Sequence, residues 1–497
     1  MRHGWVLLAL IACGDDGGNG TSDAAVDAAV DAATPQATCA PIALADTSAP
    51  TATVGDGSAA SCTEAALRTA VAAGGTIVFN CGAAPVTITV TSQISTAKET
   101  VIDGGGTVTL SGGGTSRILY LDSDYNTTTP RLTVQRLSFR DGKGPTTGDD
   151  TVQGGGAIYR DGGSLTVIDC AFEGNHATAT GQDLAGGAIY GFGGGEIVIS
   201  GSTFTGNSAS DGGAVGSLNG DLTIINSSFT GNSATGTGGN PGSGGCGGAL
   251  YMDGADEKTS LCGVVVKDST AGAIGGGFFR VSNTHTGSFA MSKSTFDNNR
   301  VTPTTSGNAG GLYLEGLALT IDASTISRNQ AFYNGGIWIN TCSVAMTNTT
   351  IAENTAFGSN GGGVWLGNGP TGTMTNVTIA NNHSTAAGQV AGGIFGGGLT
   401  LVNTLIANNT AMYTPVCDKK RTDGSGNLQW PDSALCTTSP TIADPLLGAL
   451  GNNGGPTETM LPAAGSPAKG LATGCPPMDQ AGNARGEPCT AGAIEAP

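Results

Sequence analysis

Charge, aromatic side chains and long apolar stretches are all scarce in this chain of 497 residues. Charged residues make up 12% of the sequence and aromatic residues 5%, and no apolar run approaches the ~20 residues of a membrane-spanning helix. Basic residues are the scarcer charges, 20 against 38 acids, and the resulting net charge of −18 repels a phosphate backbone. The composition therefore predicts neither a transmembrane helix nor a nucleic-acid partner.

Glycine is the residue present in excess. It fills 85 of the 497 positions, or 17%, where an ordinary soluble chain has about 7%. The glycines do not recur at every third position, which excludes a collagen helix. Because a glycine costs an α-helix up to about 1 kcal/mol relative to alanine, the sequence predicts a chain made mainly of strands and turns.

The first residues have the features of an export signal. A short basic head, Met1 to Gly4, precedes the apolar stretch Trp5 to Ala12, and Cys13 follows directly. Leu10-Ile11-Ala12-Cys13 resembles the lipobox of bacterial lipoproteins. The resemblance implies a signal peptide over residues 1–12, lipid attachment at Cys13 and a place in the cell envelope, in the outer membrane or at the cell surface. The alternative is an ordinary secretion signal with an incidental cysteine, which also predicts export.

Residues 13–50 are rich in glycine, aspartate and alanine and contain no aromatic residue. Such a segment buries too little surface to offset the entropy of ordering it. We predict a disordered tether that follows the lipidated cysteine and holds a folded body off the membrane.

Two motifs repeat in step along residues 155–409. Paired glycines followed by apolar residues occur nine times with a mean period close to 30 residues, beginning at Gly155 and Gly186. An apolar residue followed three positions later by asparagine recurs between them. Its asparagines are Asn175, Asn207, Asn232, Asn299, Asn329, Asn354, Asn382 and Asn409.

Each period holds three short β-like stretches separated by glycine or asparagine, which tolerate the positive φ of sharp corners. This pattern predicts an all-β fold, a parallel β-helix solenoid over residues 51–410. Equivalent residues of successive coils lie about 4.8 Å apart, so the eight asparagines can hydrogen-bond to one another as a structural ladder.

The repeats and the chain ends resemble known families. Gly-Gly-Ala-Ile at 155–158 and 186–189, with Phe-x-x-Asn at 172–175, looks like the repeat of the chlamydial polymorphic outer-membrane proteins, adhesins built on right-handed β-helices. The entry segment 62–79 and the exit segments 444–456, 465–467 and 489–495 resemble secreted bacterial β-helix proteins of the choice-of-anchor Q type. These resemblances imply a right-handed β-helix at the cell surface and bring no catalytic residues.

Both ends of a solenoid need atypical units that cover the open coil. Residues 62–73 have the one helical pattern in the chain, with Ala66, Leu67, Ala70 and Val71 on one face. We predict a short N-terminal capping helix there and an irregular C-terminal cap over residues 411–497.

Twelve cysteines in an exported chain predict disulfides. Sequence does not determine their connectivity. Pairing of neighbours suggests Cys62–Cys81, Cys246–Cys262, Cys417–Cys436 and Cys475–Cys489. Cys170 falls in a column of small residues and is expected to be packed rather than reactive.

Metal and cofactor sites are not predicted. His176 and His383 occupy equivalent positions but lie seven coils apart, roughly 34 Å, and cannot share an ion. Asp122-Ser-Asp124-Tyr-Asn126 opens like a calcium loop but lacks its glycine and its distal glutamate.

Parallel β-helices include enzymes that cleave polysaccharides, which need grouped carboxylates or a positioned base. The candidate region for such chemistry holds Asp253, Asp256, Glu257, Lys258 and Arg280. We favour a solvated insertion without catalysis over this reading.

An aromatic column is the other candidate site. It comprises Phe279, Tyr313, Trp338, Trp365 and Phe395. Facing outward, these rings would form a stripe for sugars or apolar partners. Facing inward, they would be core. We favour the inward orientation, because the column assigned to Tyr159, Gly216 and Arg280 would then face water and spare an arginine from burial.

The sequence thus predicts a lipid-anchored bacterial cell-surface β-helix with a structural, adhesive or glycan-contacting role. Its expected partners are the membrane, through the N-terminal lipid, and an extracellular polysaccharide or another cell-surface protein. The alternative is a secreted polysaccharide lyase or glycoside hydrolase of the β-helix type.

Overall fold

A computed structural model describes residues 39–148, 152–302, 306–388, 390–413 and 416–497. The chain divides into two units, Met1–Thr34 and Pro35–Pro497, and the second contains the whole described structure. The predicted signal peptide, Cys13 and the tether up to residue 38 lie outside the described residues. No helix within the described ranges is long and apolar enough to cross a membrane.

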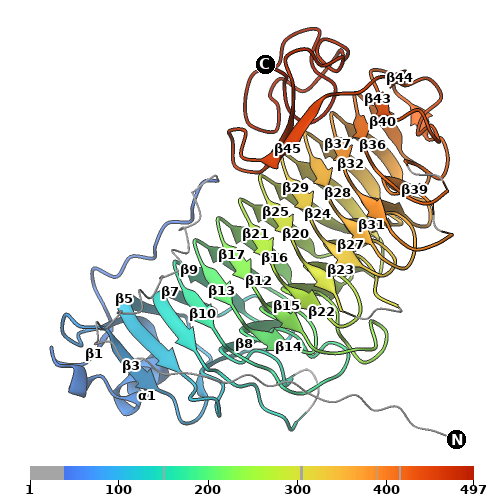
Figure 1. Cartoon of the computed structure of the whole chain (residues 1–497). Coiled ribbons are helices and arrows are strands. Elements are labelled where there is room, and N and C mark those ends of the chain that lie inside the picture. The colour runs from blue at the N-terminus through green and yellow to red at the C-terminus, as the bar shows by residue number, and fades with distance from the viewer. Residues whose placement is uncertain (1–38, 149–151, 303–305, 389, 414–415) are drawn as a thin grey trace, which may run out of the picture. The chain divides into compact units, whose positions relative to one another are not determined.

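The body is a parallel β-helix, as predicted. Each coil contributes up to four short strands, which we number as segments one to four in chain order. In one coil, β11 (Ile189–Phe192), β12 (Glu196–Ser200), β13 (Thr203–Thr205) and β14 (Ser208–Ala209) follow one another, and β15 (Val215–Leu218) begins the next coil. Every segment pairs in parallel with its equivalent one coil away, as Ile189 does with Val215. Figure 1 shows these equivalent strands side by side along the stack.

The first segments form an eleven-stranded sheet, referred to below as the first sheet. Its strands besides β11 and β15 are β4 (Ile94–Thr96), β6 (Leu119–Asp122), β8 (Ile158–Asp161), β19 (Leu250–Gly254), β23 (Phe278–Ser282), β27 (Leu312–Glu315), β31 (Ile337–Asn340), β35 (Val364–Leu366) and β39 (Ile394–Gly396). The fourth segments form a seven-stranded sheet of two-residue strands. Its strands besides β14 are β18 (Ser233–Ala234), β22 (Thr270–Ala271), β26 (Arg300–Val301), β30 (Gln330–Ala331), β34 (Thr355–Ala356) and β38 (His383–Ser384).

The second and third segments belong to one 26-stranded sheet, because the long strands β5 (Thr100–Ser111) and β7 (Arg131–Arg140) run through both positions. The second segments besides β12 are β9 (Ser164–Ile168), β16 (Asp221–Ile225), β20 (Lys258–Cys262), β24 (Gly287–Ser292), β28 (Leu317–Asp322), β32 (Ser343–Thr347), β36 (Thr371–Thr375), β40 (Thr400–Val402) and β42 (Thr422–Asp423). The third segments besides β13 are β10 (Ala171–Glu173), β17 (Ser228–Thr230), β21 (Val265–Lys267), β25 (Thr295–Asp297), β29 (Thr325–Ser327), β33 (Thr350–Ala352), β37 (Thr378–Ala380), β41 (Leu405–Ala407), β43 (Leu428–Trp430) and β44 (Thr441–Ile442).

Asparagine and glycine have different structural roles at the coil corners. The backbone N–H and the side-chain amide of Asn175 both donate to Oδ1 of Asn207, at 2.9 and 3.0 Å, and the same pair of bonds recurs between most of the predicted asparagines. The predicted ladder is interrupted once, between Asn232 and Asn299, where Ser269 takes the position and its backbone N–H donates to Oδ1 of Asn299. The positive φ belongs to the residue before each asparagine, such as Gly206 at +63°. A Cβ on Gly248 would lie 2.0 Å from the carbonyl oxygen of Gly276 in the next coil. Glycine is therefore required in that column by the close approach of stacked backbones.

The N-terminal end is closed by the predicted capping helix. The helix α1 (Glu64–Ala73) is the only α-helix in the described part of the chain, and its buried residues are Leu67, Ala70 and Val71. The Thr63 side chain accepts the Ala66 N–H and caps the first turn. Around this helix lie the 3₁₀ turn η1 (Ala59–Ser61) and the strands β1 (Ala52–Val54), β2 (Gly75–Phe79) and β3 (Val86–Thr89).

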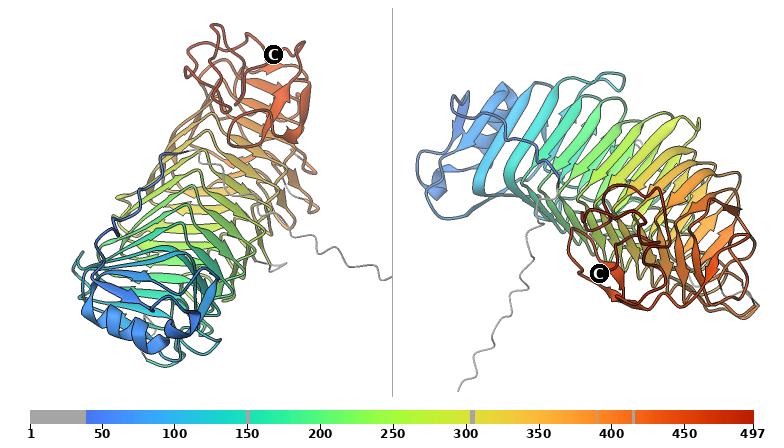
Figure 2. Two further views of the ribbon diagram at one scale, coloured as in Figure 1. Left: turned by 90° about the vertical axis from the view of Figure 1, so that its left-hand side faces the viewer. Right: turned by 90° about the horizontal axis from the view of Figure 1, so that it is seen from above.

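The C-terminal segment has two parts. Residues 416–442 continue the stack through β42, β43 and β44 and end it. Residues 443–497, the C-terminal module, contain the antiparallel pair β45 (Leu447–Gly451) and β46 (Thr459–Pro462) and return along the flank of the third segments. Figure 2 shows this module beside the last coils.

Small outward residues make room for the C-terminal module. Ala352 and Ala380, at the ends of β33 and β37, pack against Met460 of the module. The corresponding positions in earlier coils are Thr230, Lys267 and Asp297, which are polar. The switch from polar residues to alanine marks where the module lies.

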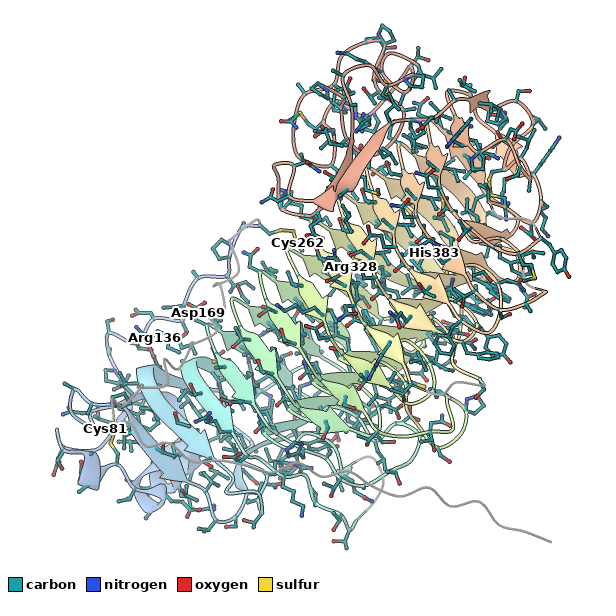
Figure 3. All side chains as sticks on the ribbon, in the orientation of Figure 1. Cys81, Arg136, Asp169, Cys262, Arg328 and His383 are labelled. Carbon is teal, nitrogen blue, oxygen red and sulfur yellow. A yellow bond between two sulfur atoms is a disulfide. The ribbon has the colours of Figure 1, made fainter. Side chains whose placement is uncertain are left out.

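Residues 39–50, which we name the strap, run along the same flank over the earlier coils. The backbone N–H groups of Cys39, Ile42 and Ala45 donate to the side chains of Asn226, Ser200 and Gln135. Cys39 also forms a disulfide with Cys262. Figure 3 shows Arg136, Asp169 and Cys262 in turn along this flank. The strap, expected to be part of the tether, is therefore part of the body.

Candidate functional site

The aromatic column of the first sheet faces outward. Trp338 lies between Ile337 and Ile339, which are fully buried in the lumen of the solenoid. It pairs in register with Tyr313 on one side and Trp365 on the other, and both are half-buried like itself. The inward orientation that we favoured from the sequence is wrong.

The error arose because the sequence alignment of the repeats placed Arg280 one residue out of register. This residue pairs with Met252 and Leu314, which are lumenal, whereas Phe279 pairs with Tyr251 and Tyr313. Since successive strand residues point to opposite faces, the shift exchanged the two columns. Arg280 is in fact fully buried inside the solenoid.

The outward column extends further than the sequence analysis recognised. It begins at Tyr120, continues through Tyr159 and Tyr190, passes Gly216 and Tyr251, and joins the five predicted rings. Ring centroids from Tyr251 to Phe395 are separated by 5.3, 5.3, 5.9, 4.5 and 4.4 Å. The rings from Tyr251 to Phe395 therefore form a continuous ladder, and Gly216 separates them from the tilted rings of Tyr120, Tyr159 and Tyr190.

Stacking determines which ring surfaces a ligand can reach. The interplanar angles from Tyr251 to Trp365 are between 5° and 22°, so these rings use their faces on one another and turn their edges outward. Phe395 is tilted by 49° against Trp365 and ends the ladder. Sugar rings pack on aromatic faces, so stacking on a sugar is restricted to the Phe395 end, while the other rings offer apolar edges.

The two halves of the outward column differ in how far other residues bury the rings. Tyr159, Tyr190, Tyr251 and Phe279 are buried in a second apolar cluster outside the lumen, together with loop residues such as Cys246. From Tyr313 to Phe395 the rings are half-buried. The open half is the candidate contact surface.

Buried carboxylates hold the loops that cover the first half. The Tyr251 hydroxyl donates to Asp183, and Nδ2 of Asn240 donates to the Tyr251 oxygen at 2.8 Å and to Asp253 at 2.7 Å. Asp211 accepts the backbone N–H of Cys246 at 2.7 Å, and burial raises the pKa of Asp211 to about 8. Sequence analysis missed Asp183 and Asp211, because isolated loop aspartates carry no pattern.

The charged residues proposed as a catalytic region do not converge. Asp253 points outward and accepts from Asn240, Asn283 and its neighbour Gly254, whereas Arg280 points into the lumen. The Arg280 guanidinium donates to Oγ1 of Thr259 at 3.1 Å and to the carbonyl of Glu257 at 2.6 Å.

Two lumenal arginines act as internal ties. Burial lowers the pKa of Arg280 to about 10, which leaves the group positive at neutral pH. Arg160 lies in the same column and donates to the carbonyls of Gly163 and Gly193, at 2.9 and 3.1 Å. Both arginines satisfy corner carbonyls. A correct alignment of the repeats would have placed both arginines at the same strand position, and this shared position could have assigned them to the lumen.

Carboxylates do meet at one corner groove of about 450 Å³, lined by Arg131, Glu196, Asp221 and Glu257 among others. Arg131 pairs with Glu196 at 2.8 Å, and Asp221 accepts the backbone N–H of Lys258 at 2.8 Å. Burial raises the pKa of Glu257. Lys258 and Asp256 are exposed beside it.

A larger groove, of about 820 Å³, lies between the C-terminal module and the flank. Two of its polar residues are already committed to the seam. Asn348 donates to the Met478 carbonyl at 3.1 Å, and Gln480 accepts from Thr350 at 2.7 Å and donates to Thr325 at 2.9 Å. Asp479, which also lines the groove, accepts the backbone N–H groups of Asn483 and Glu495, so these three polar side chains already have partners within the protein.

Within the described ranges, no group of three or more His, Cys, Asp or Glu side chains could hold a metal ion. His176 and His383 each hydrogen-bond through Nδ1 to a hydroxyl of the next coil, Ser208 and Thr410, at 2.8 Å.

Four disulfides lie within the described part of the chain. Cys62–Cys81, Cys417–Cys436 and Cys475–Cys489 are confirmed. The expected pair Cys246–Cys262 is wrong, because Cys246 lies outside the first sheet and Cys262 bonds to Cys39. Cys170, Cys246 and Cys342 are buried thiols. Four disulfides indicate an extracellular or exported protein.

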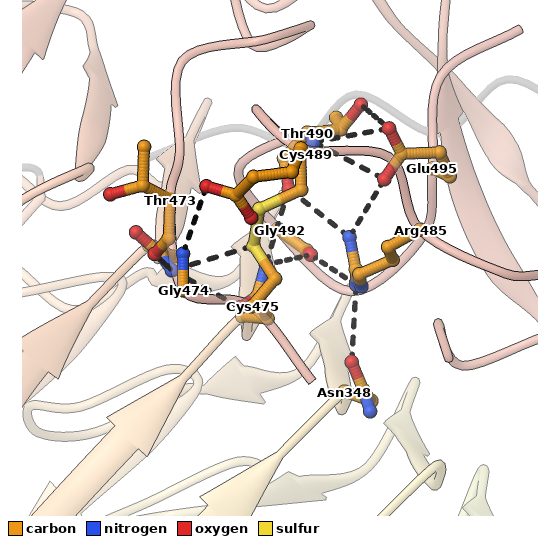
Figure 4. Close-up of a disulfide and its surroundings, with 12 residues drawn as sticks. Asn348, Thr473, Gly474, Cys475, Arg485, Cys489, Thr490, Gly492 and Glu495 are labelled. Atoms are coloured by element: carbon orange, nitrogen blue, oxygen red, sulfur yellow. Dashed lines mark hydrogen bonds and ion pairs between the residues drawn. A yellow bond between two sulfur atoms is a disulfide. The ribbon is translucent and has the colours of Figure 1, made fainter. Parts of the chain in front are cut away.

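Figure 4 shows the Cys475–Cys489 disulfide and the hydrogen bonds around it. The Arg485 guanidinium donates to the carbonyls of Gly492 and Ala493 and to Oδ1 of Asn348, and it pairs with Glu495 at 3.2 Å. The bond to Asn348 joins the C-terminal module to the flank, and the other bonds hold the module together.

The chain matches no protein-family model, and no curated protein is significantly similar to it in sequence. The class that the geometry defines is a disulfide-stapled parallel β-helix.

Proposed function

We propose that the protein is a lipid-anchored cell-surface β-helix of bacterial type, whose body is a non-catalytic binding or adhesive scaffold. One observation supports the proposal most. Charged groups that a polysaccharide-cleaving enzyme would need are hydrogen-bonded within the protein itself. Arg280 binds carbonyls inside the lumen, and Asp253 is held by amides under a loop. Four disulfides suit an oxidising, exported location.

The contact surface in this proposal is the open half of the aromatic ladder, from Tyr313 to Phe395. Apolar ring edges favour an apolar partner on another cell-surface protein, and the tilted Phe395 ring favours a sugar at the end of the ladder. Both partner classes are tested by retention of the purified body on immobilised polysaccharides and on cells.

The expected result is retention that falls at least tenfold for Phe395→Ala or Trp365→Ala. Tyr125→Ala, which removes an exposed ring elsewhere on the body, is the matched control. Equal retention of all variants would refute the ladder as the contact surface. Lipid anchoring is tested separately, by flotation of a Cys13→Ala variant, which should leave the membrane fraction.

The corner groove supports a second candidate, a polysaccharide lyase or glycoside hydrolase. Glu196, Asp221 and Glu257 line one groove, and the raised pKa of Glu257 suits a general acid. The test is release of reducing ends or unsaturated products from acidic and neutral polysaccharides. Product formation that is lost in Glu257→Gln and kept in the exposed neighbour variant Asp256→Asn would favour the enzyme over the scaffold.

A further inference from the structure

The Cys39–Cys262 disulfide joins the start of the strap to the middle of the stack. The two residues are 223 positions apart in sequence, and their Cα atoms are 6.1 Å apart. Cys262 ends β20, so the chain that precedes Cys39 is connected at this coil and not at the N-terminal cap.

From Cys39 the strap runs back toward the N-terminal end. Its contacts occur in order with Asn226, Ser200, Gln135 and Asp103, and β1 then pairs with β2. No residue of the strap is buried, and Leu44 is 41% exposed. Hydrogen bonds at a solvated surface contribute little individually, so the strap alone resists peeling weakly.

We propose that Cys39–Cys262 is a load-bearing latch. It moves the mechanical attachment point of the body from its N-terminal coil to β20. A pull on the chain before Cys39 passes through the disulfide into Cys262, and the closed covalent loop between the two cysteines carries no tension. That loop contains α1 and the coils up to β20. They are shielded from any force applied through the N-terminal chain.

This proposal depends on the disulfide alone and holds whether or not Cys13 is lipidated. Its value to an anchored protein is that drag on the body cannot peel the strap and open the capped end. The two proposals can therefore be refuted independently. A force measurement tests the latch, and flotation tests the lipid anchor.

The test is single-molecule force spectroscopy on the exported chain, with one handle at its N-terminal end and one after Pro497. Oxidised wild type should extend without the residues between Cys39 and Cys262. In Cys39→Ser/Cys262→Ser, 223 residues less the 19 closed by Cys62–Cys81 become extensible. These 204 residues add about 700 Å at ~3.3–3.6 Å per residue.

The matched control is Cys62→Ser/Cys81→Ser. With the latch intact this change should leave the final length unaltered, because the cap lies inside the shielded loop. In the variant without the latch it should add about 65 Å, from 19 residues at ~3.3–3.6 Å each. Release of the full length by oxidised wild type, or a length change from the cap disulfide while the latch is present, would overturn the proposal.

A peptide map of the non-reduced wild type keeps the test decisive if the double variant does not fold. A linked peptide pair containing Cys39 and Cys262 is expected. A Cys246–Cys262 pair would overturn the latch directly.

Discussion

The earlier and later coils of this solenoid are built on one strand pattern and yet present different surfaces. In the earlier coils the outward aromatic rings are buried under loops, and the flank is crossed by a thin strap. In the later coils the rings from Tyr313 to Phe395 are half-open, and the flank is buried under the C-terminal module. The repeat therefore determines the strands, whereas the loops, the strap and the C-terminal module determine which surfaces are exposed to solvent.

Covalent support differs in the same way. The strap is held by one disulfide that closes 223 residues, and the C-terminal module contains one that closes 14. In the chain-entropy model, loss of the first should lower the free energy of unfolding by about 5 kcal/mol and loss of the second by about 3 kcal/mol. Denaturant titration of Cys39→Ser/Cys262→Ser against Cys475→Ser/Cys489→Ser measures the comparison. Equal losses would contradict it.

The covered and open halves of the aromatic ladder should respond differently to truncation. Phe279→Ala opens a cavity in the buried half and should cost roughly 3–5 kcal/mol. Phe395→Ala removes a half-buried terminal ring and should cost about half as much. Thermal or denaturant unfolding of the two variants checks the ratio, and a loss at Phe395 as large as the loss at Phe279 would show that the later rings are equally enclosed.

The alanine column beneath the C-terminal module can be tested by introducing charge. Ala380→Glu places an unpaired carboxylate against Met460 and should cost about 3 kcal/mol or detach the module. Thr230→Glu changes an equivalent outward position in a coil that the module does not cover, and it should stay within about 0.5 kcal/mol. Limited proteolysis between residues 443 and 497 reports detachment. Resistance of Ala380→Glu to the protease would argue against docking at this column.

The loops over the buried half should respond to pH. The folded-state pKa of Asp211 is raised from 3.8 to about 8, so the folded protein holds a proton that the unfolded chain releases. Stability from this group is greatest at low pH and falls as pH rises toward 8. Between pH 6 and 7 the loss is at most about 1.4 kcal/mol. Asp211→Asn should flatten this dependence, whereas the exposed Asp256→Asn should not. Identical pH profiles for wild type and Asp211→Asn would refute the assignment.

The candidate site was only partly predictable, because a one-residue shift at Arg280 reverses which column faces out. Local spacing identified the five rings, but the loop lengths between coils vary and leave the register open. Pairing of Phe279 with Tyr251, visible only in the fold, places the rings outside and the arginine inside. The carboxylates Asp183 and Asp211 had no sequence signal, since they act through contacts between separate loops.

By itself the sequence determined the coil. The paired glycines and the asparagine ladder are local patterns that recur from coil to coil because stacked backbones need them, and the capping helix is a local pattern that occurs once, at the N-terminal end. The tertiary structure alone decided what lies on the outside of the coils. Cys39 finds Cys262 across 223 residues, while Cys246, only 16 positions from Cys262, lies on another side of the coil. Chain proximity predicts contacts within a turn, but partners many coils apart are determined by the folded path of the strap and the module.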